Sequence, residues 1–124
     1  MAMIIIGERI NATRKPIAHA IKRRDAEFIV REARTQIEAG ATYLDLNAGL
    51  GRGTEKEDLA WLISTVQEVF QPPLCLDSSD PEVLEFCLPL VRNPDVMINS
   101  ITGEARRISR LEPVIRNYPK AKVV

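Results

Sequence analysis

The sequence alternates short apolar runs, which predict strands, with longer stretches of helical periodicity. The predicted strands are Met3–Ile6, Tyr43–Asn47, Leu74–Leu76, Val96–Asn99 and Ala121–Val124. We expect the first, isoleucine-rich run to be buried on both faces, and Gly7–Thr13 to form a polar loop after it. Strand and helix alternate four times before the fifth strand opens, which predicts a parallel α/β sheet with right-handed crossovers.

Start and stop signals place the helices between these strands. We expect helices over Pro16–Arg23 and Ala26–Ala39, one beginning after Thr54, one at Pro81, and one carrying Ile108, Leu111 and Ile115. Asp25 is positioned to cap the second helix, and Gly40 to end it with a positive φ angle. Thr54 and Glu57 have the spacing of a capping box, and a proline such as Pro81 is common at a first helical position.

Polar side chains gather at the carboxyl ends of four predicted strands. Asp45 and Asn47 end the second strand, Asp77 follows the third, and Asn99 ends the fourth, while Asn11 lies in the loop expected after the first. Because side chains alternate along a strand, the polar residues of strands two to four share the face opposite their leucine, valine and isoleucine residues. The carboxyl ends of parallel strands are where α/β proteins hold ligands, so we expect the functional site there.

Chain length decides between two forms of this sheet. A closed eight-stranded barrel needs about 250 residues, and this chain of 124 residues supplies about half of that. We therefore interpret residues 1–124 as one partial barrel domain, the N-terminal half of a TIM (β/α)8 barrel in a longer protein. The alternative is a self-sufficient open sheet of five strands, for which a strand that starts at the last residues is a poor ending.

Composition narrows the class of protein. The chain is 45% hydrophobic and 27% charged, and its 17 basic residues balance 17 acidic ones. This balance argues against binding to nucleic acid or to an anionic membrane, and no apolar run reaches the ~20 residues of a membrane span. We expect a cytoplasmic protein in which Cys75 and Cys87 are buried free thiols. With one histidine and no C-x-x-C motif, we expect no metal site.

Four short motifs resemble a known family in order and in spacing. They are Ile5–Asn11, Leu44–Asn47, Leu74–Ser78 and Met97–Ser100. These motifs resemble the successive strand ends of the pterin-binding barrels, and more closely those of the methyltetrahydrofolate:corrinoid-protein methyltransferases. The resemblance runs along essentially all of the chain, and four motifs in register are more specific than any one of them. It implies a TIM-barrel fold, in agreement with the alternation of side chains along the strands.

The resemblance also implies a site and a reaction. Asp77 corresponds to the carboxylate that holds the pterin ring and Asn99 to the amide beside it, while Asn11, Asp45 and Asn47 match polar positions around the same mouth. The implied reaction passes a methyl group between N5 of 5-methyltetrahydrofolate and the cobalt of a corrinoid carried by a partner protein. Full-length members are expected to form homodimers. The family's groups near N5 come from the second half of the barrel, so the catalytic residues are unknown here.

Alternatives remain for the residues and for the function. Asp77 could cap the helix at Pro81, although Ser79 and Asp80 are better placed to do so, and Asp45 and Asn47 could simply shape loops. The protein could be a non-catalytic pterin-binding or assembly subunit. It could also be similar to dihydropteroate synthase, although the loop after the first strand differs from that of the synthases.

Overall fold

The computed structural model describes residues 3–51, 53–99 and 122–123, and its strands form one parallel sheet in the order β1-β2-β3-β4-β5. The strands are β1 (Ile6–Asn11), β2 (Tyr43–Asn47), β3 (Leu74–Asp77), β4 (Val96–Asn99) and β5 (Lys122–Val123). The helices are α1 (Lys15–Arg23), α2 (Ala26–Glu38), α3 (Glu55–Gln67) and α4 (Pro81–Cys87), which continues into the 3-10 turn η1 (Leu88–Leu90). Each described strand therefore lies beside the next one in the chain.

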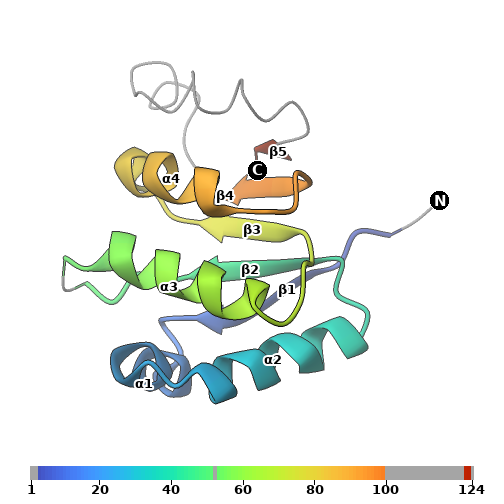
Figure 1. Ribbon diagram of the computed structural model, residues 1–124, viewed down its shortest axis with the longest axis horizontal. Coiled ribbons are helices and arrows are strands. Elements are labelled where there is room, and N and C mark those ends of the chain that lie inside the picture. The colour runs from blue at the N-terminus through green and yellow to red at the C-terminus, as the bar shows by residue number, and fades with distance from the viewer. Residues whose placement is uncertain (1–2, 52, 100–121, 124) are drawn as a thin grey trace.

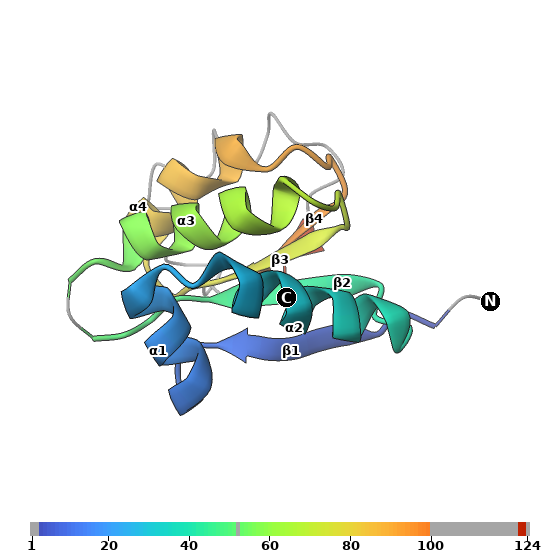
Figure 2. The ribbon, with the colours of Figure 1, turned by 60° about the horizontal axis from the view of Figure 1, so that its bottom comes forward.

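The helices form one layer along the sheet, as Figures 1 and 2 show. Buried residues from α1 to α4 join residues of the strands in a single apolar cluster, which places these helices on the same face. A doubly wound sheet reverses its strand order and carries helices on both faces. Sequential order under one helical layer is instead the arrangement of a (β/α)8 barrel. The predicted fold class, parallel (βα) units as in the N-terminal half of a TIM barrel, is confirmed.

Alternation along the strands separates two faces, as the sequence predicts. On the helix-covered face, six fully buried residues of β2, β3 and β4 pack against the helices: Leu44, Leu46, Leu74, Leu76, Val96 and Ile98. On the opposite face, which we call the inner face, Tyr43, Cys75 and Met97 form a separate small cluster. Both cysteines are buried free thiols. The inner face is where the polar strand ends also lie.

The predicted first strand is wrong in position. Met3, Ile4 and Ile5 are 79%, 54% and 44% exposed, so this run is not buried on both faces. The strand instead runs through the expected polar loop, from Ile6 to Asn11. The reason is pairing, because Ile6 lies opposite Tyr43 and the ladder with β2 extends from there. Register with a neighbouring strand therefore overrides the β-branched composition of the first residues.

The helix caps follow the prediction at two of three sites. Asp25 accepts a hydrogen bond from the backbone N–H of Phe28, and Asp80 accepts one from that of Glu82. The capping box at Thr54 is wrong: Thr54 is the N-cap residue of α3, but its side chain makes no capping hydrogen bond.

The Thr54 hydroxyl is used by a neighbouring carboxylate instead. It donates to the buried carboxylate of Asp58 at 2.6 Å, and Asp58 also pairs with Arg24 at 2.9 Å. Hydrogen bonds to a carboxylate are strong, and this one orients the Thr54 side chain toward Asp58, where its oxygen accepts no capping hydrogen bond from the first turn of α3. This contact joins the start of α3 to the α1–α2 corner.

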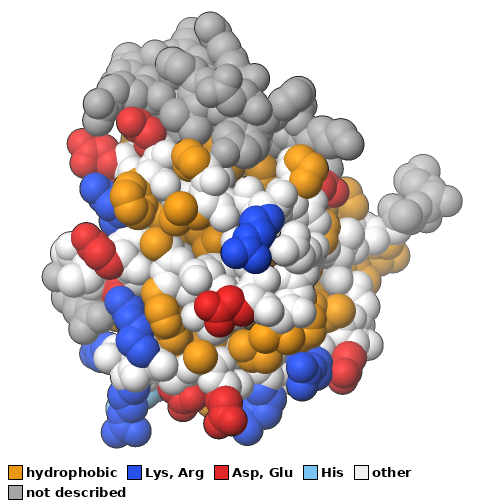
Figure 3. Space-filling model, viewed as in Figure 1, with side chains coloured by type: hydrophobic (Ala, Val, Ile, Leu, Met, Phe, Trp, Pro, Cys, Tyr) orange, Lys and Arg blue, Asp and Glu red, His pale blue; other side chains and the backbone are white. Residues whose placement is uncertain are grey.

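Two predicted elements involve residues outside the described part of the chain. The helix expected around Ile108, Leu111 and Ile115 lies there entirely. The fifth strand is described over Lys122–Val123, inside the predicted Ala121–Val124, and pairs with Met97 and Ile98. No helix of the described residues is long and apolar enough to cross a membrane. Acidic and basic side chains are interspersed with apolar ones on the surface that Figure 3 shows.

Candidate functional site

Four polar residues lie in one row across the inner face, at the carboxyl ends of β1 to β4. Asn11 pairs with Asn47, and Asp77 pairs with Asn99. Asn47 and Asp77 follow directly after the paired residues Leu46 and Leu76, so they are neighbours as well. We call Asn11, Asn47, Asp77 and Asn99 the strand-end row. All four are half-buried, which leaves them partly accessible to a ligand.

A β-bulge brings Asn11 into this row. Gly7 pairs with Leu44 and Ile10 with Leu46, so β1 has one more residue than β2 over this interval. In a regular strand Ile6 and Asn11 would lie on opposite faces, because they are five positions apart, and the extra residue of the bulge places them on the same face. The backbone N–H of Arg9 within the bulge donates to the buried side chain of Gln36 at 3.0 Å. Helix α2 therefore holds the bulge that turns Asn11 inward.

The two asparagines at one end of the row also shape their loops. The Asn11 side-chain oxygen accepts hydrogen bonds from the backbone N–H and the hydroxyl of Thr13. The Asn47 side-chain oxygen accepts one from the backbone N–H of Gly49 at 2.9 Å. The loop-forming alternative therefore holds for Asn47 as far as its oxygen is concerned. These bonds orient both amides, whose N–H groups are the remaining donors.

Asp77 does not cap α4, because the neighbouring residues perform that task. Asp80 caps the helix, and the Ser78 hydroxyl accepts from the backbone N–H of Asp80 at 3.1 Å. The backbone N–H of Ser78 donates to the carbonyl oxygen of Asn99 at 2.8 Å, which joins the ends of β3 and β4. Asp77 is thereby available for a ligand. With Asn47 it lines a pocket of about 270 Å³.

Asp45 lies one row deeper than the other candidates. It pairs with Cys75, and its side chain is buried, with a residue exposure of 1%. Burial, hydrogen bonding with the Asp77 carboxyl group and the charges of Asp77 and Glu8 raise the pKa of Asp45 to about 8. Burial and the charge of Asp45 also raise the pKa of the Cys75 thiol. The structure therefore separates Asp45 from the strand-end row to which the sequence assigned it.

The site includes residues that the sequence analysis did not single out. The pocket beside Asp77 is also lined by Thr13, Gly49, Glu55, Ser78 and Ser79. Glu55 comes from the first turn of α3, and only the fold brings it to the strand ends. Of these residues, only Ser78 and Ser79 could have been expected at the site from the sequence, because they directly follow the strand-ending Asp77. Among the described residues there is no group of three or more His, Cys, Asp or Glu that could hold a metal.

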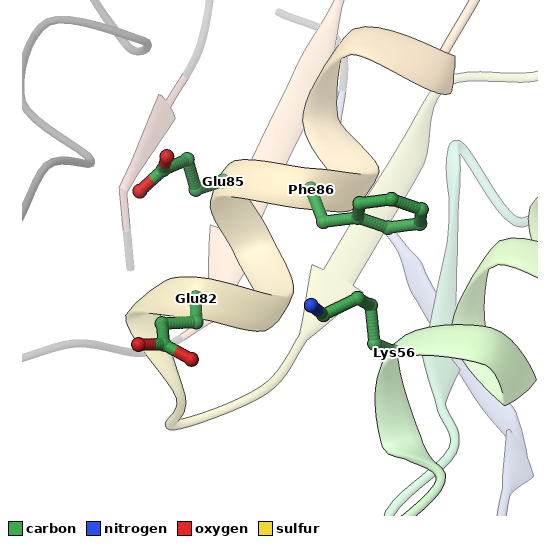
Figure 4. A pocket seen from close by; sticks show the side chains of 4 residues that line it. All are labelled: Lys56, Glu82, Glu85 and Phe86. Atoms are coloured by element: carbon green, nitrogen blue, oxygen red, sulfur yellow. The ribbon is translucent and has the colours of Figure 1, made fainter.

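A larger hollow lies elsewhere, between α3 and α4. Lys56, Glu82, Glu85 and Phe86 line this pocket of about 390 Å³, as Figure 4 shows. The Lys56 ammonium lies 5.2 Å from the centre of the Phe86 ring. Its residues come from helices on the covered side of the sheet, and none belongs to the strand-end row. We therefore take the inner face as the candidate site.

Comparisons with known proteins bear on this site. The family of pterin binding enzymes matches residues 7–124 of the chain. The methylcorrinoid:tetrahydrofolate methyltransferase of Eubacterium limosum is 43% identical over 112 residues. Those residues are 90% of this chain but only 41% of the relative, so the chain spans less than half of that protein's length.

Proposed function

The chain belongs to the family of pterin binding enzymes, and from this premise we propose that its strand-end row binds the pterin ring of a folate. The observation that carries the proposal is the row itself, in which one carboxylate and three amides lie side by side on the inner face. Such a set offers both acceptors and donors to a planar heterocycle.

The chemistry of the ring assigns separate roles to Asp77 and Asn99. A pterin presents a ring N–H next to an exocyclic amino group, and the Asp77 carboxylate can accept both in a forked pair. Hydrogen bonds to an ionised group are about twice as strong as neutral ones. Asn99 offers a donor and an acceptor together, which suits the nitrogen–carbonyl edge of the ring. Asn11 and Asn47 contribute amide N–H groups nearby.

We further propose that the protein transfers a methyl group between tetrahydrofolate and a corrinoid. The support is the 43% identity with a methylcorrinoid:tetrahydrofolate methyltransferase. The corrinoid would be carried by a partner protein, and residues 1–124 would form part of a pterin-binding barrel domain. A homodimeric full-length form and a cytoplasmic location stay predictions.

Calorimetric titration of the chain with 5-methyltetrahydrofolate tests the binding proposal. We expect saturable binding at one site, and competition by a pterin that lacks the glutamate tail. Absence of any saturable binding would contradict the proposal. Transfer of a methyl group from methylcobalamin to tetrahydrofolate then separates a catalyst from a pterin-binding subunit, because a binding subunit shows the first result without the second.

A further inference from the structure

The side chain of Asp45 is buried on the inner face, and no cation of the described residues acts on its charge. The groups that act on its charge are Asp77 and Cys75 from β3 and Glu8 from β1. None of these carries a positive charge. The two ion pairs of the described residues, Arg9 with Glu32 and Arg24 with Asp58, do not include Asp45.

One carboxyl oxygen of Asp45 also has no acceptable partner if the group is ionised. Oδ1 is buried and receives no hydrogen bond from any described residue. The Asp77 carboxyl group is within hydrogen-bonding reach of Asp45, but two ionised carboxylates cannot donate to each other. The Cys75 thiol also hydrogen-bonds to Asp45 and lowers its pKa, but a thiol is a weak donor and does not offset burial beside two other carboxylates. A single proton on Asp45 removes the charge and supplies the missing donor.

We propose that Asp45 carries a proton at neutral pH and donates it in a hydrogen bond to Asp77, as a positioning residue beneath the pterin site. Asp77 accepts this hydrogen bond, and its remaining lone pairs can accept from a ligand at the strand-end row. Asp45 then acts on the ligand only through Asp77. Its role in ligand binding rests on the proposed function, whereas the protonation itself does not.

The pH dependence of stability follows from the direction of the shift. The pKa of Asp45 is raised to about 8 in the folded chain, against about 3.9 for an unperturbed aspartate. Between these values the folded state holds a proton that the unfolded state has lost. Stability therefore falls as the pH rises from about 4 to about 8, and this contribution levels off above the folded pKa. Ligand binding should weaken over the upper end of the same range, as Asp77 loses its donor.

Asp45→Asn separates this proposal from a direct ligand role. Asparagine has the shape of a protonated aspartate and also offers one donor face and one acceptor face. We expect Asp45→Asn to bind 5-methyltetrahydrofolate within about threefold of the parent at pH 7 and to lose the weakening at higher pH. Asp45→Ala, which has no donor, should bind at least about tenfold more weakly. Asp25→Asn is the matched control, because it changes an exposed helix cap and should leave both pH profiles unaltered.

Carbon-13 NMR of the ligand-free chain tests the proton directly, with the Asp45 side-chain carboxyl resonance assigned through its own backbone. We expect this resonance to titrate near pH 8. Titration below about pH 5 would overturn the proposal, as would an Asp45→Asn variant that folds but binds as poorly as Asp45→Ala. A resonance that titrates near pH 8 in a chain that binds no folate would support the protonation and refute only the proposed function.

Discussion

The two faces of the sheet are built from neighbouring residues of the same strands, yet they do different work. In β3, Leu76 is buried under the helices, whereas Asp77 at the next position lies half-buried in the strand-end row. The helix-covered face is wholly apolar across β2, β3 and β4. The inner face changes from an apolar cluster to polar residues toward the strand ends. Stability is therefore concentrated on one face, and the proposed ligand site lies at one edge of the other.

The largest effect should come from the helix-covered face. Leu76→Ala removes a fully buried side chain and leaves a cavity, so we expect a loss of about 2–5 kcal/mol in the free energy of unfolding. Urea denaturation measures this loss, and the fraction that stays folded should bind folate with unchanged affinity. A loss of affinity in that folded fraction would break the division between the two faces.

Asp77→Asn, one residue along the strand, should lower folate affinity and leave stability nearly unchanged. It keeps the volume but removes the charge, and it turns an acceptor toward the N–H groups of the ring into a donor. Losing a hydrogen bond to a charged group costs about 1.5–3 kcal/mol, which is about a ten- to hundredfold loss of folate affinity. Calorimetry measures the affinity, and the melting temperature should change little because Asp80 still caps α4. Unchanged affinity would make Asp77 a structural residue.

Gln36→Leu tests whether α2 positions Asn11 by holding the bulge of β1. The substitution leaves the Arg9 backbone N–H without its acceptor, and an unsatisfied donor costs about 1–3 kcal/mol. We expect lower stability together with weaker folate binding, since Asn11 depends on the bulge for its place in the row. Urea denaturation and calorimetry are read on the same sample. Stability lost with affinity intact would show that Asn11 is not needed for binding.

The smallest effect should come from a helix end remote from both faces. Asp25→Ala removes the side-chain cap of α2, for which we expect a loss of about 0.5–2 kcal/mol in stability. Thermal unfolding measures this loss, and folate affinity should stay at the parent value. Asp25→Ser, which restores a capping oxygen, should recover most of the stability. A change in affinity would contradict the expectation that only the strand ends contact the ligand.

Local signals in the sequence determined most of the framework. Strands β2, β3 and β4, the start of α4 and the cap of α2 lie where the pattern predicts them. The assignment of residues to the two faces followed as well, because alternation is a property of any extended strand. The sequence also allowed the inference that Asp77 does not cap α4, since a better-placed cap, Asp80, lies three residues after it. These features depend on residues close together in the chain.

The tertiary structure decided the features that depend on distant partners. The β1 register and its bulge are set by pairing with β2 and by Gln36 of α2. The strand predicted from the apolar run that starts at Met3 was therefore wrong in position. The Thr54 hydroxyl donates to Asp58, which is held by an ion pair with Arg24, a residue 34 positions earlier in the chain. The pKa of Asp45 is raised because the fold buries its side chain and brings Asp77 and Glu8 toward it. Protonation, burial and strand register depend on which residues are neighbours in space, and local sequence patterns do not specify those neighbours.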